Sequence, residues 1–357
     1  RSNKNVIMSL LFRSCSAAVS CECTTSNNST TTTNPSSSFM TLKGAPLAAS
    51  AFQSLTPEEQ DRVHRDLYGL EEPINETPDF IEQKLKELQT HIDKLKESTK
   101  HYYSLALSQE KQQQQKVGHN NDNVVSSPKF LLMFLRSECF DALKAARRLA
   151  LYFQEKYDLF GKDLLACRIQ QCHFEEPEDQ DLFFSKAFCC TGATDMAGRP
   201  IVLFRHEHAM MVDIFRMRRV IFYLVQIVLE DNEVAQQKGF ITVVNNIDRD
   251  TTHKPFESRK MFPFPRMLMN ILPIRLAGVH ICYDDMREHL VLNLILVLAP
   301  IDCRARFQCH FWRTQAECMF DLMNYGISPE TYQLSIDEYD SMRHKTIHDF
   351  LEQHRLL

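Results

Sequence analysis

Three arginines bracket an almost solidly apolar stretch of the sequence, with Arg275 before it and Arg304 and Arg306 after it. A guanidinium group offers several N–H donors in a planar fork, which suits bidentate contact with a phosphate or a carboxylate. Two alternatives stay open, because the arginines either contact an anionic ligand or form structural ion pairs. The carboxylates nearest to them in sequence are Asp284, Asp285 and Asp302.

The sequence lacks the motifs of the common catalytic sites. It has only 9 glycines, and no G-x-G-x-x-G, G-K-[ST] or G-x-S-x-G occurs. Loops that cradle phosphates and the nucleophile turn of α/β-hydrolases need these patterns. A net charge of -5 gives no overall basicity that would favour nucleic acid. We therefore predict a protein that is not an enzyme, with no catalytic residues, no cofactor and no nucleic-acid partner.

Cysteines and histidines are the remaining candidates for metal chemistry. The 12 cysteines stand mostly in apolar surroundings and no C-x-x-C occurs, which is typical of reduced, packed cysteines in a cytosolic protein. Cys167, Cys172 and His173 have spacing for half of a zinc site, but the second half is missing. Residues 206–208 (HEH) suggest metal or acid–base chemistry, but without a motif partner the sequence favours histidines at the surface or at a loop edge. We predict no metal site.

Residues 289–299 are apolar almost throughout. The stretch is too short to span a bilayer, which takes about 20 residues, and too apolar for an ordinary surface helix. It is either a buried core helix or a mobile lid whose side chains contact lipid or a membrane surface. The positions that we assign to such a gate are Leu290, Leu294, Ile295 and Leu298.

The elements around these residues alternate between strands and helices after residue 175. Strands are predicted at 200–205 (PIVLFR), 239–245 (GFITVVN), 276–282 and 304–311, with a long apolar helix at 213–230 between the first two. This alternation predicts an α/β fold with a mostly parallel, helix-covered sheet.

The first half of the chain is predicted to be helical after a polar tail. Ser, Thr and Asn dominate residues 21–38, which cannot bury enough apolar surface to fold. Helix starts are indicated at Thr56 and Pro57 and again at Pro128, whereas residues 111–123 have the composition of a polar linker. The predicted parts are a disordered tail (1–55), a helical unit (56–175), a sheet domain (176–345) and a C-terminal tail (346–357).

Two stretches carry a resemblance to a known family. Residues 130–136 (FLLMFLR) with Phe140 and Asp141 match the family pattern FLLRFLRARKFD, and residues 273–307 give PIR, a GVHI strand, an apolar helix and a basic segment. In this order they resemble the CRAL-TRIO lipid-binding domain, the family of the retinaldehyde-binding and tocopherol transfer proteins. The resemblance implies a pocket lined by Val202, Phe204, Ile241, Val243, Val279 and Ile281.

The resemblance also implies a function. We expect a cytoplasmic protein that associates peripherally with membranes and binds or transfers a phospholipid, phosphoinositide or isoprenoid-like ligand through the gated pocket. Arg275, Arg304 and Arg306 would contact the headgroup. The partners would be the lipid and, transiently, a membrane surface that carries phosphoinositide in one version of the hypothesis. The alternative is an interaction module that keeps the fold but fills the pocket with its own side chains.

Overall fold

The computed structural model describes most of the chain after residue 45. Contacts between Cα atoms divide the chain into Arg1–Leu42 and Lys43–Leu357, and all described residues belong to the second unit. The described residues are 46–70, 72, 74–117, 124–174, 176, 178–179, 188–204, 213–230, 232–247, 267–268, 270–285, 289, 292–293, 296–297, 299, 301–312 and 314–330.

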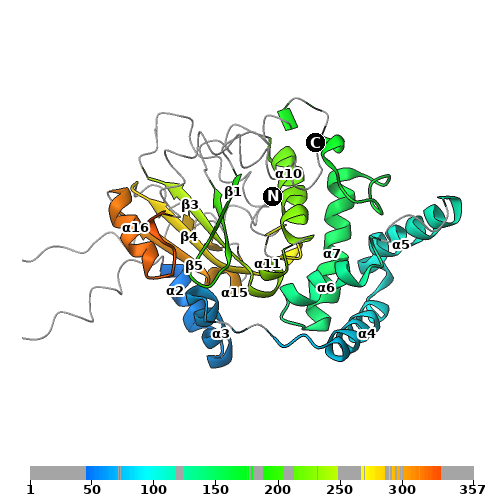
Figure 1. The fold of residues 1–357 in the computed structure, drawn as a ribbon, viewed down its shortest axis with the longest axis horizontal. Helices are drawn as coiled ribbons and strands as arrows, with labels where there is room; N and C mark the ends of the chain where they lie inside the picture. The colour runs from blue at the N-terminus through cyan, green and yellow to red at the C-terminus, as the bar shows by residue number, and fades with distance from the viewer. Residues whose placement is uncertain are drawn as a thin grey trace, which may run out of the picture. The chain divides into compact units, whose positions relative to one another are not determined.

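A five-stranded sheet lies at the centre of this unit (Figure 1). Its strands follow their order in the sequence, β1-β2-β3-β4-β5. The first pair is antiparallel, and β2 to β5 are parallel to their neighbours. The predicted α/β class with a mostly parallel sheet is therefore confirmed. The strands are β1 (Phe188–Thr194), β2 (Pro200–Phe204), β3 (Phe240–Asn246), β4 (Leu276–Tyr283) and β5 (Phe307–Phe311).

The last predicted strand begins later than expected. The prediction started it at Arg304, but Ile301–Arg304 forms the short helix α15 and the strand starts only at Phe307. The two arginines of this segment are therefore separated, because Arg304 ends a helix while Arg306 lies just before β5.

Four helices before the sheet pack mainly on one another, with α7 contacting α4, α5 and α6. Three of them begin at side chains that accept a hydrogen bond from a backbone N–H of the first turn, which are Thr77, Ser127 and Asp141. The linker predicted from residue 111 is wrong in its first part, because α5 continues through it. Glutamine and lysine are good helix formers, which explains the longer helix. The helices are α4 (Pro78–Lys94), α5 (Glu97–Val117), α6 (Pro128–Ser137) and α7 (Ala142–Phe160).

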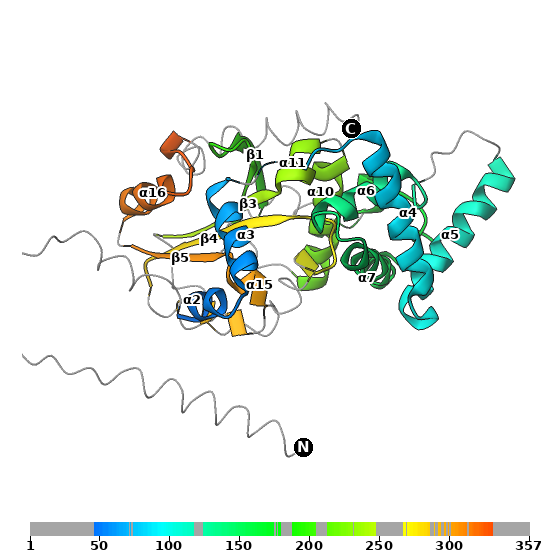
Figure 2. The ribbon, with the colours of Figure 1, turned by 90° about the horizontal axis from the view of Figure 1, so that it is seen from below.

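The first two helices, α2 (Pro46–Gln53) and α3 (Pro57–Tyr68), pack on the sheet and on the helix that precedes its last strand. Figure 2 shows α3 across the strands, in line with its contacts with β4 and those of α2 with α15. A capping box between Thr56 and Glu59 starts α3 at the predicted place. The tail predicted to reach residue 55 is too long, because α2 lies within it. The prediction also grouped α3 with the helices after residue 77, whereas its contacts are with the sheet.

The two faces of the sheet are covered by different helices. On the face that we call the α10 face, the strands share one apolar cluster with α10 (Ile214–Glu230). On the opposite face, the α16 face, they share another with α16 (Gln315–Met323). Two short helical elements complete the described elements, α11 (Glu233–Lys238) before β3 and the 3₁₀ helix η1 (Gln171–His173) after α7.

Candidate functional site

The six residues predicted to line one pocket lie on both faces of the sheet. Val202 and Phe204 on β2 share the α10 cluster with Val279 and Ile281 on β4. Ile241 and Val243 on β3 belong instead to the α16 cluster. Side chains alternate between faces along a strand, and the register pairs Val202 with Thr242, so the two β3 residues point to the other side. The prediction of a common pocket is corrected to the four residues of the α10 face.

These four side chains are packed against protein atoms. Phe204, Val279 and Ile281 are only 6%, 5% and 4% exposed, and Val202 is half-buried. Little free space therefore adjoins the α10 face at these three residues. A ligand there would have to displace side chains that now cover the strands.

The predicted gate lies largely outside the described residues. This is true of Leu290, Leu294, Ile295 and Leu298. Of their neighbours, Leu292 and Leu296 are buried in the α10 cluster, while Val297 is 40% exposed.

The gate segment is anchored to the α10 face at its start. The hydroxyl of Tyr283, at the end of β4, lies 2.7 Å from Nδ1 of His289. Partial burial lowers the pKa of His289 below its usual value. The segment therefore begins beside the strands that carry Val279 and Ile281.

Two of the three predicted headgroup arginines meet at one carboxylate. Nη2 of Arg275 lies 2.6 Å from Oδ1 of Asp66, and Nη2 of Arg306 lies 2.6 Å from Oδ2 of the same side chain. Asp66 comes from α3 and is 2% exposed. Each guanidinium thus takes one oxygen of a buried carboxylate, which is the structural ion pair considered from the sequence, but with a partner about 200 residues away instead of a neighbouring aspartate.

Arg304 lies apart from this cluster. Its Nε donates a hydrogen bond of 2.8 Å to the carbonyl of Ala299, at the end of the predicted gate. The structure therefore brings together only Arg275 and Arg306 of the predicted basic set.

Arg199 completes the charged cluster, and sequence reasoning missed it. It pairs with Asp195 in the turn between β1 and β2, with 2.6 Å between Nη2 and Oδ2 and both side chains almost fully buried. Its guanidinium also donates to the carbonyls of Asp66 and Leu67, the last turn of α3. A cation at a helix C-terminus is favoured by the exposed carbonyls and the helix dipole.

The α16 face carries a buried chain of hydrogen-bonded rings that was also missed. Nδ1 of His280 on β4 lies 3.0 Å from Nε2 of His310 on β5, and Nδ1 of His310 lies 2.8 Å from Oδ2 of Asp321 on α16. The indole N–H of Trp312 donates to the same Oδ2 at 3.1 Å. The signal in the sequence was a lone histidine in each of two mostly apolar strands.

The pKa values of His280 and Asp321, the two ends of this hydrogen-bond chain, are shifted by different causes. Burial lowers the pKa of His280 well below its usual value, and the charge of Arg199 acts in the same direction. Burial alone would raise the pKa of Asp321, but the hydrogen bonds from His310 and Trp312 bring it below its usual value. The chain therefore joins an ionised carboxylate to a neutral, buried imidazole.

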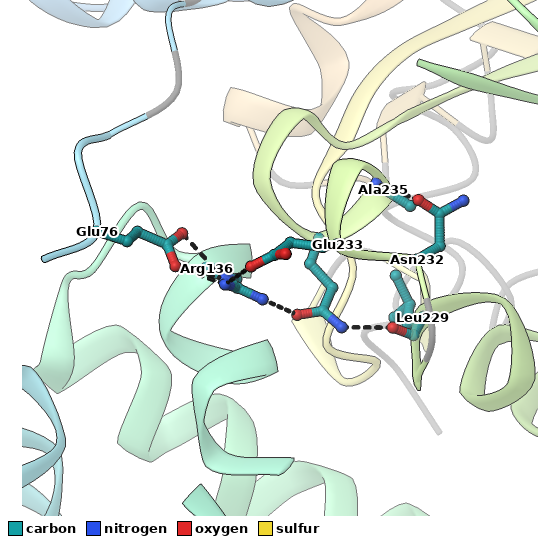
Figure 3. Close-up of polar contacts among 7 residues, drawn as sticks. Glu76, Arg136, Leu229, Asn232, Glu233 and Ala235 are labelled. Atoms are coloured by element: carbon teal, nitrogen blue, oxygen red, sulfur yellow. Dashed lines mark hydrogen bonds and ion pairs between the residues drawn. The ribbon is translucent and has the colours of Figure 1, made fainter. Parts of the chain in front are cut away.

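Arg136, in the stretch that carries the family resemblance, connects the helical part to the sheet part (Figure 3). Its Nε lies 2.9 Å from Oε1 of Glu76, before α4, and its Nη groups reach Glu233 and Gln236 on α11. Gln236 in turn donates to the carbonyl of Leu229 at the end of α10. All three guanidinium nitrogens are used, so this arginine ties three segments together.

No metal centre is built from the described residues, since they contain no group of three or more histidine, cysteine, aspartate or glutamate side chains placed for an ion. Of the three residues considered as half of a zinc site, Cys167 donates to the carbonyl of Asp163, and Nδ1 of His173 accepts from the amide of Gln170. Residues 206–208 lie outside the described residues. Of the helices described, none is long and apolar enough to cross a membrane.

Comparison with known proteins gives no assignment. No family model matches this sequence. No curated protein matches it either. The likeness to the CRAL-TRIO family therefore rests on the motifs in residues 130–141 and 273–307 alone.

Proposed function

We propose that this protein binds one hydrophobic lipid molecule between the α10 face of the sheet and the apolar segment that follows β4. The observation that carries the proposal is the anchoring of that segment on this face, through Tyr283 and His289 and through the buried Leu292 and Leu296. A ligand that displaced part of this segment from the strands would lie between two apolar surfaces, which favours an apolar ligand.

Ligand exchange would follow from competition between two apolar environments. Each fully buried Leu or Val side chain contributes about 1.5–3 kcal/mol, so the closed segment is stable over the sheet or over a ligand. The same side chains would favour a membrane when the segment opens. We infer transient, peripheral contact with a membrane, where the lipid would enter or leave.

The interaction module with a filled pocket is the second candidate. It is favoured by the low exposure of Phe204, Val279 and Ile281, which are covered by protein atoms. In that case the fold would present its helices to a protein partner and no lipid would be carried.

Native mass spectrometry of the full chain after exposure to mixed-lipid vesicles tests the proposal. We expect a species with one lipid bound per protein. Val279→Phe, which enlarges a side chain of the α10 face, should lower the lipid-bound fraction. Val243→Phe is the matched control, because it makes the same change at a buried strand position of the α16 face.

Both substitutions should cost stability, about 1–3 kcal/mol for an overpacked core position. The difference in lipid-bound fraction between the two variants therefore reports the effect of the α10 face alone. The bare protein mass with every lipid class would support the filled-pocket module. Equal loss of lipid in the two variants would mean that stability, and not the α10 face, controls the occupancy.

A further inference from the structure

Residues 57–69, which we call the N-terminal strap, are held on the sheet by polar contacts and by a small apolar cluster. In that cluster Val63 and Leu67 pack on Ala305, apart from the two main clusters, whereas Ala48 of α2 belongs to the cluster of the α10 face. Beyond α3, Leu70 and Ile74 are exposed. The strap therefore connects to α4 through a segment with exposed apolar side chains, and α3 can leave the sheet while α2 stays packed in the α10 cluster.

The end of α3 fits tightly against the sheet. Gly69 adopts a φ of 67°, and a Cβ at this position would lie 2.5 Å from the Cβ of Ala197 in the turn between β1 and β2. Leu67 reaches the α16 face at β4, where a Cβ on Gly278 would lie 3.4 Å from Leu67 Cδ2 and 3.3 Å from Nε2 of His280. Leu67 and His280 Nε2 thus border the same small space.

The hydrogen-bond chain on this face has one open end, and it lies under the strap. Asp321 accepts from Nδ1 of His310, so when both rings are neutral Nε2 of His310 accepts from Nδ1 of His280. This leaves the Nε2 lone pair of His280, which has no hydrogen-bond partner in the part of the chain that the structure describes. The side chain is 0% exposed. A proton added to the hydrogen-bond chain places an N–H at this nitrogen, beside the small space that Leu67, Ile241 and Gly278 border.

The charges around His280 oppose that proton while the strap is bound. Besides burial, His310 and Arg199 lower the pKa of His280, and the charge of Asp321 acts in the opposite direction. Other ionisable groups that face this region are Tyr68 and Asp66 of α3, Asp195 of the turn, Arg275 and Arg306 beside Asp66, Cys282 and Cys318 between β4 and α16, and Tyr325, whose ring meets that of His280 edge to face. A bare imidazolium in this place would have no acceptor for its Nε2–H.

We propose that the N-terminal strap is a proton-releasable cover of the sheet, with Nε2 of His280 as the group that takes the proton when α3 leaves. Undocking Leu67 opens the space beside Gly278 to water, which solvates the imidazolium. Proton uptake and strap release therefore favour each other, since a group that binds a proton more strongly in one state shifts the equilibrium toward it. Acidification releases the strap, and with it the contacts of Asp66 with Arg275 and Arg306.

Hydrogen exchange of the full chain, followed by mass spectrometry between about pH 7.5 and about pH 5 and corrected for intrinsic exchange rates, tests this. Below the usual pKa of histidine, the protection of α3 should fall by up to about tenfold per pH unit, as expected for one proton. Peptides from α7 should keep their protection, because α7 packs mainly on α4, α5 and α6. A loss of protection in α7 parallel to α3 would mean global unfolding and overturn the proposal.

His280→Gln removes the titrating nitrogen and should abolish the pH dependence of α3. His64→Gln, on the same helix but exposed, is the control and should retain it. Leu67→Ala provides a second test if His280→Gln does not fold, since it opens the space above Gly278 and should raise the pH at which the strap is released. Protection of α3 that does not change with pH in the wild type, or an unchanged slope in His280→Gln, would refute the role of His280.

Discussion

Lys156 is a charged side chain enclosed by the helical part of the protein. It lies on α7, 2% exposed, and its Nζ donates a hydrogen bond of 2.6 Å to the carbonyl of Cys167. Burial lowers its pKa from 10.5 to about 8, and Cys167 and Glu230 act weakly in the opposite direction. The folded protein therefore holds an ammonium group in a place that favours the neutral amine.

Lys156→Met should stabilise the protein at neutral pH. Between pH 8 and 10.5 the unfolded state binds more protons than the folded state, so the wild-type free energy of unfolding should rise with pH across this window. Below it the full cost remains, about 3 kcal/mol at about 1.4 kcal/mol per pKa unit. A lost hydrogen bond of about 1 kcal/mol leaves a net gain of about 2 kcal/mol.

Urea unfolding at pH 7 and above pH 9 measures both effects of Lys156→Met. Lys144→Met, exposed on the same helix, is the control and should keep the slope with pH. A variant less stable than the wild type at pH 7 would show that the contacts of the ammonium group outweigh its burial.

At the scale of elements, Arg136 binds two carboxylates with different surroundings. The side chain of Glu76 is 8% exposed and that of Glu233 is 67% exposed. Loss of a buried partner leaves an arginine charge without compensation, which costs more than loss of an exposed partner. The stability of the joint at Arg136 therefore depends mainly on Glu76.

Glu76→Gln should lower the free energy of unfolding by about 2–3 kcal/mol, and Glu233→Gln by less than about 1 kcal/mol. Chemical denaturation of the two variants, which carry the same chemical change on the same arginine, gives the comparison. Equal losses would indicate that the link of α6 to α11, and not the buried pair, stabilises this joint.

The elements themselves were largely predictable because their patterns are local. Pro57 and Pro128 predict helix starts, and the runs PIVLF and FITVV predict buried strands. The faces of the strands were not predicted, because assigning Ile241 and Val202 to one pocket needs the register between β2 and β3. A shift of one residue in register moves every side chain to the other face.

The partners of the charged residues could not be predicted from local patterns either. The sequence gives Arg275 and Arg306 several aspartates within about ten residues, yet both bind Asp66, which reaches them only because α3 packs on β4. In the same way, His280 and His310 become neighbours only through the pairing of β4 with β5. Ion pairs and hydrogen-bond chains of this kind depend on topology, which composition and periodicity do not contain.

At the scale of the molecule, the ion pairs at Arg136 and at Asp66 are two of the contacts that join the parts of the described unit. Arg136 holds the helical part to α11, and Asp66 holds the strap to β4 and to the residue before β5. The second joint is the one at which the sequence favoured a phosphate ligand and the structure has a carboxylate. A lipid headgroup at Arg275 and Arg306 would have to displace Asp66, so strap and anion would compete for the same guanidinium groups.

A double-mutant cycle decides whether the arginine pair serves the strap. Asp66→Asn alone, and Arg275→Gln with Arg306→Gln, should each lower the protection of α3 from hydrogen exchange and the melting temperature. Adding Asp66→Asn to the arginine variant should cost little more, because the partners of the carboxylate are already gone and contacting residues are not additive. Asp61→Asn, which removes an exposed partner of Arg65 on the same helix, should leave α3 protected. Vesicle binding by the arginine variant completes the test. If the pair holds the strap, binding should fall equally on neutral and on phosphoinositide-containing vesicles. A loss of binding only on phosphoinositide-containing vesicles, smaller at high salt and with an unchanged melting temperature, would show instead that the pair binds the headgroup.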